Sequence, residues 1–136
     1  MAALSGTAPA DPLDACAEPP PDALIAGIDQ FNRRAFYECH ETLEAIWLAD
    51  RRLVRRLYQG ILQVGVAFYH LGRGNYRGAT SLLASGLDYL QSFPPVCQDV
   101  DVARLIADGR RAQAALEALR PEQCAEFDWG LVPTIR

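Results

Sequence analysis

The chain has 136 residues, of which half are hydrophobic and 22% are charged, with a net charge of −4 and a pI near 5.1. This length suits one domain with one core, and the acidic balance argues against a domain that coats nucleic acid, because such domains are usually strongly basic. All 13 positive side chains are arginines, which excludes a Schiff-base lysine and a P-loop lysine.

The cellular compartment is predicted from the first residues, the apolar runs and the cysteines. The chain does not open on a basic region followed by an apolar stretch, and its longest apolar run is far shorter than the ~20 residues that a membrane span needs. The four cysteines include no C-x-x-C pair, which argues against a zinc ribbon or a thioredoxin-like motif. We therefore expect a soluble cytoplasmic protein with reduced thiols and no membrane partner.

The first 21 residues are rich in alanine and proline and show no apolar period, which predicts a disordered tail. From Asp22, an expected N-cap, apolar residues recur at helical spacing. The expected helices cover residues 22–32, 35–49, 51–73, 76–91 and 100–119. In the third helix Asp50 is the expected N-cap, and Asn75 has the same role in the fourth.

The last residues, which include Phe127, Trp129 and Ile135, are too apolar for a free tail, and we expect them to lie across the helices. No segment alternates strongly enough to predict a strand. The connections are short, so neighbouring helices should pack antiparallel. The sequence therefore predicts an all-α, compact bundle of about five helices over residues 22–136, with two helical hairpins at its centre.

Two sequence motifs follow one another within residues 22–91. The first follows the pattern FNxxxFxExHExLExxW, and the second follows QGxxQxxxAxxHxxxGNxxGA. Their residues are Phe31-Asn32, Phe36, Glu38, His40-Glu41, Leu43-Glu44, Trp47, Gln59-Gly60, Gln63, Ala67, His70, Gly74-Asn75 and Gly78-Ala79. Together they resemble the bacterial and archaeal domain-of-unknown-function family 309. The resemblance implies a small all-α bundle, and it implies no established activity, substrate or cofactor.

The third expected helix is apolar on most faces, as a buried helix is, except along one line that holds Gln59, Gln63 and His70. Buried polar groups need partners, because an unpaired one costs roughly 1–3 kcal/mol. The preceding helix offers them in residues 38–44. We therefore expect a buried hydrogen-bond network that fixes how the helices pack. Its members are Glu38, His40, Glu44, Gln59, Gln63, His70 and Asn75.

A metal site is the alternative interpretation of the same residues. His40-Glu41-x-x-Glu44 differs by one residue from the H-E-x-x-H motif of zinc proteases. His40, Glu44 and His70 would then be the ligands of zinc, iron or manganese, and Glu41 would be the base of a metal-dependent hydrolase. The network without a cofactor is the simpler hypothesis, and the sequence does not decide whether the protein is an enzyme.

Arginines 51, 52, 55 and 56 form a basic patch at the start of the third helix. Arg52 and Arg56 continue the line toward His70 and would hold a small anion at its mouth. The more ordinary alternative pairs these arginines with Glu38, Glu41 or Glu44. We expect a non-catalytic helical module that self-associates as a homodimer and binds a small anion or a protein partner, but not nucleic acid.

Overall fold

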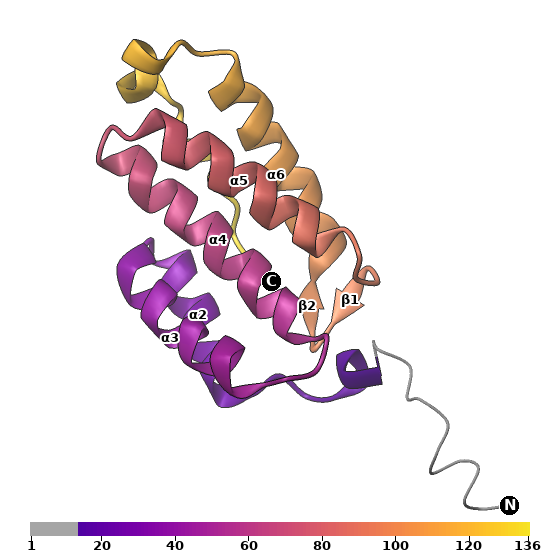
Figure 1. Cartoon of the computed structure of the whole chain (residues 1–136). Coiled ribbons are helices and arrows are strands. Elements are labelled where there is room, and N and C mark those ends of the chain that lie inside the picture. The colour runs from indigo at the N-terminus through magenta and orange to yellow at the C-terminus, as the bar shows by residue number, and fades with distance from the viewer. Residues whose placement is uncertain (1–13) are drawn as a thin grey trace, which may run out of the picture.

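The structure is a computed structural model that describes residues 14–136. Five α-helices account for most of these residues, which confirms the all-α prediction (Figure 1). In chain order the elements are η1 (Asp14–Ala17), α2 (Asp22–Asn32), α3 (Phe36–Ala49), α4 (Arg55–Gly72), α5 (Tyr76–Leu90), β1 (Val96–Cys97), β2 (Val100–Asp101), α6 (Val102–Glu117), η2 (Pro121–Glu126) and η3 (Trp129–Leu131).

Helix α4 is the central element of the bundle. It packs against α3 on one side and α5 on the other, and α6 lies beyond α5 (Figure 1). Most of its side chains are buried, among them Leu57, Ile61, Val64 and Phe68. Two neighbouring helices cover α4, which explains why the helix is apolar on most faces. The sequence predicts such a buried helix.

Two glycines let α4 and α5 approach closely. A Cβ atom at Gly86 would lie 2.8 Å from the backbone oxygen of Gly60, and one at Gly60 would lie 2.8 Å from the side chain of Leu90. Any side chain at these positions would push the helices apart. The glycines thus serve tight helix packing and do not open a cleft.

The C-terminal stretch lies across the helices, as expected. The Asn32 side-chain amide donates to the Ile135 carbonyl at 2.9 Å, and the Ile135 N–H donates to the Asn32 side-chain oxygen at 2.8 Å. Phe127, Val132 and Ile135 are buried in the common core. These contacts join the end of the described chain to the end of α2.

The third helix begins later than predicted, at Arg55 instead of Arg51. Asp50 accepts the backbone N–H of Arg52 at 2.9 Å, so it stabilises a turn before the helix and is not its N-cap. Arg52 therefore lies outside α4, and it does not continue the helical line to His70.

The prediction of a disordered tail is wrong for residues 14–21, while residues 1–13 lie outside the described part of the chain. Ala15 is buried, and Cys16 forms a disulfide with Cys97, so the predicted reduced state is also wrong for this pair. Composition alone hides this attachment, because the anchoring cysteine sits within an alanine- and proline-rich segment.

Strands β1 and β2 form a small antiparallel hairpin that the sequence analysis missed, since two-residue strands are too short to show alternation. Gln98 in its turn is only 1% exposed. It accepts the Tyr58 hydroxyl at 2.8 Å and donates to the Ala15 carbonyl at 3.2 Å. A buried polar network thus exists, but it joins η1, the hairpin and α4.

Within residues 14–136, no helix is both long enough and apolar enough to cross a lipid bilayer.

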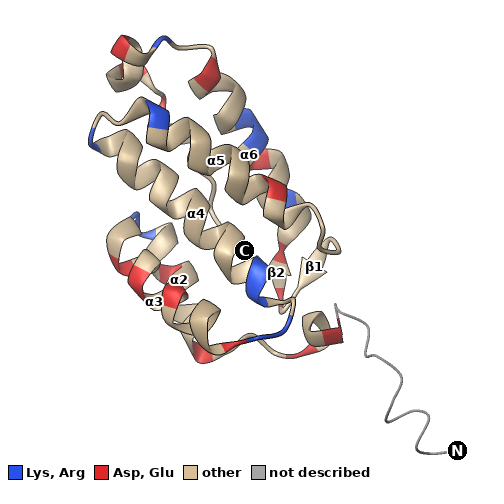
Figure 2. Ribbon diagram, in the orientation of Figure 1, with Lys and Arg blue, Asp and Glu red and all other residues tan. Residues whose placement is uncertain are grey.

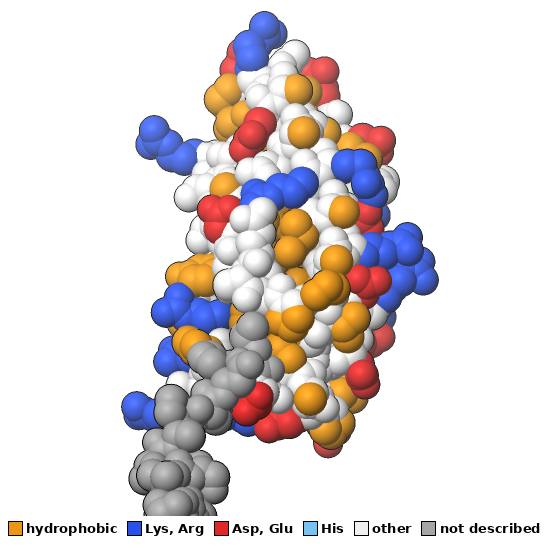
Figure 3. All heavy atoms as spheres, turned by 90° about the vertical axis from the view of Figure 1, so that its right-hand side faces the viewer, with side chains coloured by type: hydrophobic (Ala, Val, Ile, Leu, Met, Phe, Trp, Pro, Cys, Tyr) orange, Lys and Arg blue, Asp and Glu red, His pale blue; other side chains and the backbone are white. Residues whose placement is uncertain are grey.

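The side of the molecule on the right of Figure 1 gathers hydrophobic side chains in its middle, with charged side chains mainly toward the margins (Figure 3).

Candidate functional site

The two histidines of the chain line one pocket between α3 and α4. The pocket has a volume of about 210 Å³. Its lining residues are Phe36, Tyr37 and His40 from α3 and Val66, Tyr69 and His70 from α4. Both imidazoles are candidate site residues in the sequence, but the sequence did not predict that they would share a wall of aromatic side chains. We call this the aromatic–histidine pocket.

His40 pairs with Glu44 one turn further along α3. The His40 Nε2 atom lies 3.2 Å from a Glu44 carboxylate oxygen, and the two side chains are 35% and 45% exposed. The pair is therefore partly solvated and does not form the buried contact that we predicted. Glu44 orients the imidazole at the edge of the pocket.

His70 pairs with Asn75 in the turn that follows α4. The Asn75 amide nitrogen lies 3.4 Å from His70 Nδ1, and the Asn75 side-chain oxygen accepts the Gly78 N–H at 2.9 Å. Asn75 is thus the N-cap of α5, as predicted. Because its amide donates, Nδ1 of His70 is the acceptor in this contact.

The two glutamines face other surroundings. The Gln63 side-chain oxygen accepts the Ser85 hydroxyl of α5 at 2.7 Å, so Gln63 points away from α3. Gln59 is half-buried, and its side chain makes no hydrogen bond within residues 14–136. The predicted closed network of His40, Glu44, Gln59, Gln63 and His70 is therefore divided into separate pairs.

The predicted metal ligands do not come together either. Among residues 14–136, no three His, Cys, Asp or Glu side chains are close enough to hold a metal ion, so His40, Glu44 and His70 do not form a ligand set. Glu38 and Glu41 are exposed on α3 and lie outside the lining of the pocket. The geometry offers no support for Glu41 as the base of a metal-dependent hydrolase.

Aromatic contacts join the α3 side and the α4 side of the aromatic–histidine pocket. The Tyr37 and Tyr69 ring centroids lie 5.9 Å apart, and those of Tyr37 and His40 lie 6.4 Å apart. The Arg73 guanidinium lies 5.7 Å from the Tyr69 ring centroid, in a cation–π contact. Tyr37 is nonetheless 52% exposed. A large aromatic side chain that stays this open is available for contact with another molecule.

One rim of the pocket is acidic. Helices α2 and α3 contain five acidic residues and no lysine or arginine, and the red segments of these helices lie together in Figure 2. Three of the acidic residues are on α3, namely Glu38, Glu41 and Glu44. At helical spacing, Tyr37, Glu41, Glu44 and Leu48 follow one line along α3. Leu48, at the far end of this line, is 63% exposed.

The two arginines predicted to hold an anion do not face one site. Arg52 forms ion pairs with Asp50 at 2.9 Å and with Glu18 at 2.7 Å, and its hydrogen bond holds the pKa of Asp50 below its usual value. The Arg56 guanidinium lies 5.1 Å from the Tyr89 ring centroid. The alternative prediction paired these arginines with Glu38, Glu41 or Glu44. It is wrong for Arg52, whose acidic partners are Asp50 and Glu18.

Cys39 is completely buried, and this burial raises the pKa of its thiol to about 12. Only a minute fraction is thiolate at neutral pH, so Cys39 cannot act there as a nucleophile. It fills the core next to Phe31 and Gly65.

These observations define a class of small protein in which two helical hairpins and a further helix carry an open, aromatic-lined pocket. Residues 24–82 match the family described as Domain of unknown function (DUF309), which confirms the resemblance seen in the motifs. This segment spans α2, α3, α4 and the first part of α5, and it therefore contains every residue that lines the pocket.

The chain is also similar to the uncharacterized protein YpuF of Bacillus subtilis (strain 168). The two are 37% identical over 90 residues, which cover 63% of this chain and 52% of YpuF. The chain thus spans about half the length of this curated relative. The name of the relative carries no activity that bears on the pocket.

Proposed function

We propose that this chain is a non-catalytic interaction module that binds a basic segment of a protein partner through the exposed face of α3 and α4. The observation that carries the proposal is the aromatic–histidine pocket of about 210 Å³ beside an acidic rim. An apolar side chain of the partner enters the pocket, and neighbouring lysines or arginines meet Glu41 and Glu44.

The volume of the pocket supports a single side chain as its occupant. A cavity of about 150 Å³ is large enough to hold benzene. A pocket of about 210 Å³ therefore accommodates a phenyl ring or a branched aliphatic group. Interfaces commonly place such an anchor at their centre, where its burial contributes much of the binding free energy.

The acidic rim supports a basic partner. A surface that carries exposed carboxylates attracts basic segments and raises their association rate, and both effects depend strongly on salt. On α3 no basic side chain neutralises Glu38 or Glu41, and Glu44 pairs with His40. A partner helix with an apolar face and flanking basic residues matches this arrangement.

A peptide library of basic, amphipathic helices tests the proposal. Peptides selected on the immobilised wild-type chain should carry an aromatic or aliphatic anchor flanked by lysine or arginine. Their affinity should fall at least tenfold in Tyr69→Ala and in Glu41→Gln/Glu44→Gln. The control Glu126→Gln changes an exposed acid that does not line the pocket and lies on neither α3 nor α4, and it should bind as wild type. Selected peptides that bind all variants equally would refute the proposal.

A second copy of the chain is the other partner that we propose, because Leu48 is exposed on the same line of α3 as Tyr37. A two-fold axis near the middle of α3 would place Leu48 of each copy over the pocket of the other. The same axis brings the Glu41 and Glu44 side chains of both copies together, which disfavours a tight homodimer. Sedimentation equilibrium of wild type and Leu48→Glu measures this association.

We propose a cytoplasmic location from the sequence pattern. The Cys16–Cys97 disulfide is the observation that favours a different compartment, since disulfides are rare in reducing compartments. Thiol labelling in intact cells distinguishes the two cases. Labelled Cys16 and Cys97 are expected for a cytoplasmic protein, and protected ones would contradict that location.

A further inference from the structure

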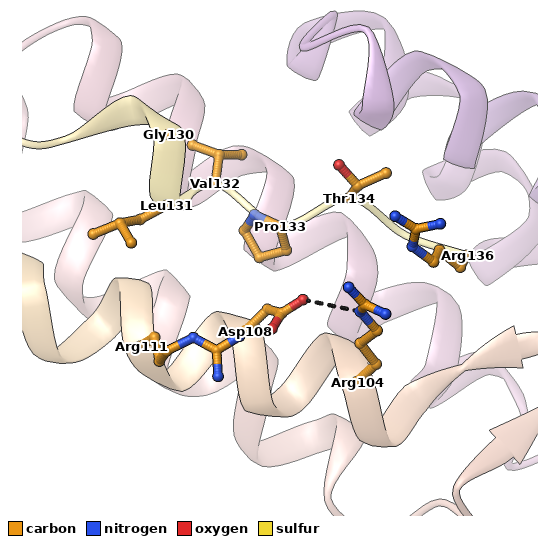
Figure 4. Close-up of a pocket in the computed structure, with 9 residues that line it drawn as sticks. All are labelled: Arg104, Asp108, Arg111, Gly130, Leu131, Val132, Pro133, Thr134 and Arg136. Carbon is orange, nitrogen blue, oxygen red and sulfur yellow. Dashed lines mark hydrogen bonds and ion pairs between the residues drawn. The ribbon is translucent and has the colours of Figure 1, made fainter.

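A second pocket, of about 240 Å³, lies between α6 and the C-terminal stretch (Figure 4). It shares no residue with the aromatic–histidine pocket. Its lining residues are Arg104, Asp108, Arg111, Gly130, Leu131, Val132, Pro133, Thr134 and Arg136. We call it the arginine pocket.

The side chains of the arginine pocket carry an excess of positive charge. Asp108 is the one carboxylate among the lining side chains, and it pairs with both Arg104, at 3.5 Å, and Arg111. The Arg136 side chain makes no ion pair within residues 14–136. Two guanidinium groups thus share Asp108 and the third, that of Arg136, has no acidic partner among the described residues, whereas Arg52 elsewhere has two acidic partners of its own.

Two of the three guanidinium groups come to the pocket from different elements. Arg104 and Arg136 both line the pocket, and in Figure 4 their side chains extend toward each other from α6 and from the C-terminal stretch. Asp108 contacts Arg104 through Nε, which leaves the two terminal nitrogens of Arg104 available. Two like charges in this position are stabilised when an anion lies between them.

We propose that the arginine pocket binds a phosphate group between Arg104 and Arg136. Guanidinium groups donate paired hydrogen bonds that match the oxygens of a phosphate, and an anion offsets the excess positive charge. The volume exceeds that of phosphate alone, so a small organic phosphate fits as well as the free ion.

Inorganic phosphate is the first probe, and the chain should carry any purification tag at its N-terminus so that Arg136 keeps its surroundings. Millimolar phosphate should broaden its own ³¹P resonance in the presence of wild type and raise the Tm by roughly 3 °C above sodium chloride of equal ionic strength. Both effects should disappear in Arg104→Gln/Arg136→Gln.

Arg77→Gln is the matched control, because Arg77 is an exposed arginine on α5 that lies outside the arginine pocket. It should respond to phosphate as wild type does. Equal Tm shifts in all three proteins, or an unbroadened ³¹P resonance with wild type, would overturn the proposal and leave an ionic-strength effect only. A larger response to malonate than to phosphate would overturn the assignment of the ligand class. Glycerol phosphate, compared with the free ion, then shows whether an organic substituent adds affinity.

Discussion

At the scale of single residues, each histidine is held by one neighbour and open to solvent on another side. An exposed pair at i,i+4 spacing contributes only about 0.3–0.5 kcal/mol, far less than a member of a closed buried network. We therefore expect His40→Ala to lower the free energy of unfolding by no more than about 0.5 kcal/mol in urea titrations. A loss of several kcal/mol would show that the predicted network exists after all.

Cys39 gives a pH-dependent prediction. Its thiol pKa is raised to about 12 in the folded chain from 9.0, so above pH 9 the unfolded chain releases a proton that the folded chain keeps. The contribution of this group to stability is complete below pH 9 and is lost as pH rises toward 12, by up to about 1.4 kcal/mol per pH unit.

Urea titrations between pH 8.5 and 10.5 check this slope. Burial also raises the pKa of Tyr58, and this tyrosine adds a slope of the same sign in both proteins. Cys39→Ala should therefore be less stable than wild type but should show the shallower decline. Parallel declines in the two proteins would contradict the pKa assigned to Cys39.

Sequence reasoning at this scale identified residues better than it identified partners. Helical spacing is enough to put Gln59, Gln63 and His70 on one line of α4. It does not say that α5 lies beside this line, so the contact of Gln63 with Ser85 could not be predicted. Asn75 was predicted correctly because capping is a local interaction that depends on neighbouring residues only.

At the scale of elements, the spacing between α4 and α5 depends on Gly60 and Gly86. Gly86→Ala should lower the free energy of unfolding by about 1–3 kcal/mol, because its Cβ would collide with a backbone atom that cannot move independently. Gly72→Ala is the control, since a Cβ there would make ordinary contacts of 3.7 Å with Trp129. Equal stability of the two variants would mean that the helices separate without cost.

Helix positions followed from the apolar period, and the bounds of α2 agree with the predicted ones at both ends. The errors lie where the apolar period carries no information. The start of α4 moved from Arg51 to Arg55 because Asp50 stabilises a turn there. The hairpin of β1 and β2 depends on left-handed backbone at Gln98 and Asp99. Left-handed backbone is uncommon at residues other than glycine, so these two residue types did not predict the turn.

At the scale of the whole molecule, the Cys16–Cys97 disulfide attaches η1 to the hairpin across a sequence separation of 81 residues. Closing so long a loop stabilises the folded chain by about 4.5 kcal/mol in the chain-entropy description. Dithiothreitol should therefore lower the Tm of wild type markedly and expose residues 14–21 to proteolysis.

The variant Cys16→Ser/Cys97→Ser is the control for this experiment. It should melt near reduced wild type and should be insensitive to dithiothreitol, because Cys39 and Cys124 are buried free thiols. An unchanged Tm of wild type on reduction would show that the disulfide does not contribute to stability.

The claim on which the account depends is that the face of α3 and α4 around the aromatic–histidine pocket is a binding surface. Titration of the ¹⁵N-labelled chain with a selected basic peptide, followed by ¹H–¹⁵N NMR, tests it most directly. The account predicts that the largest shift changes occur at Tyr37, His40, Tyr69 and His70 and that they weaken as salt rises. Largest changes on α6 or at the C-terminal stretch, with this pocket undisturbed, would contradict it.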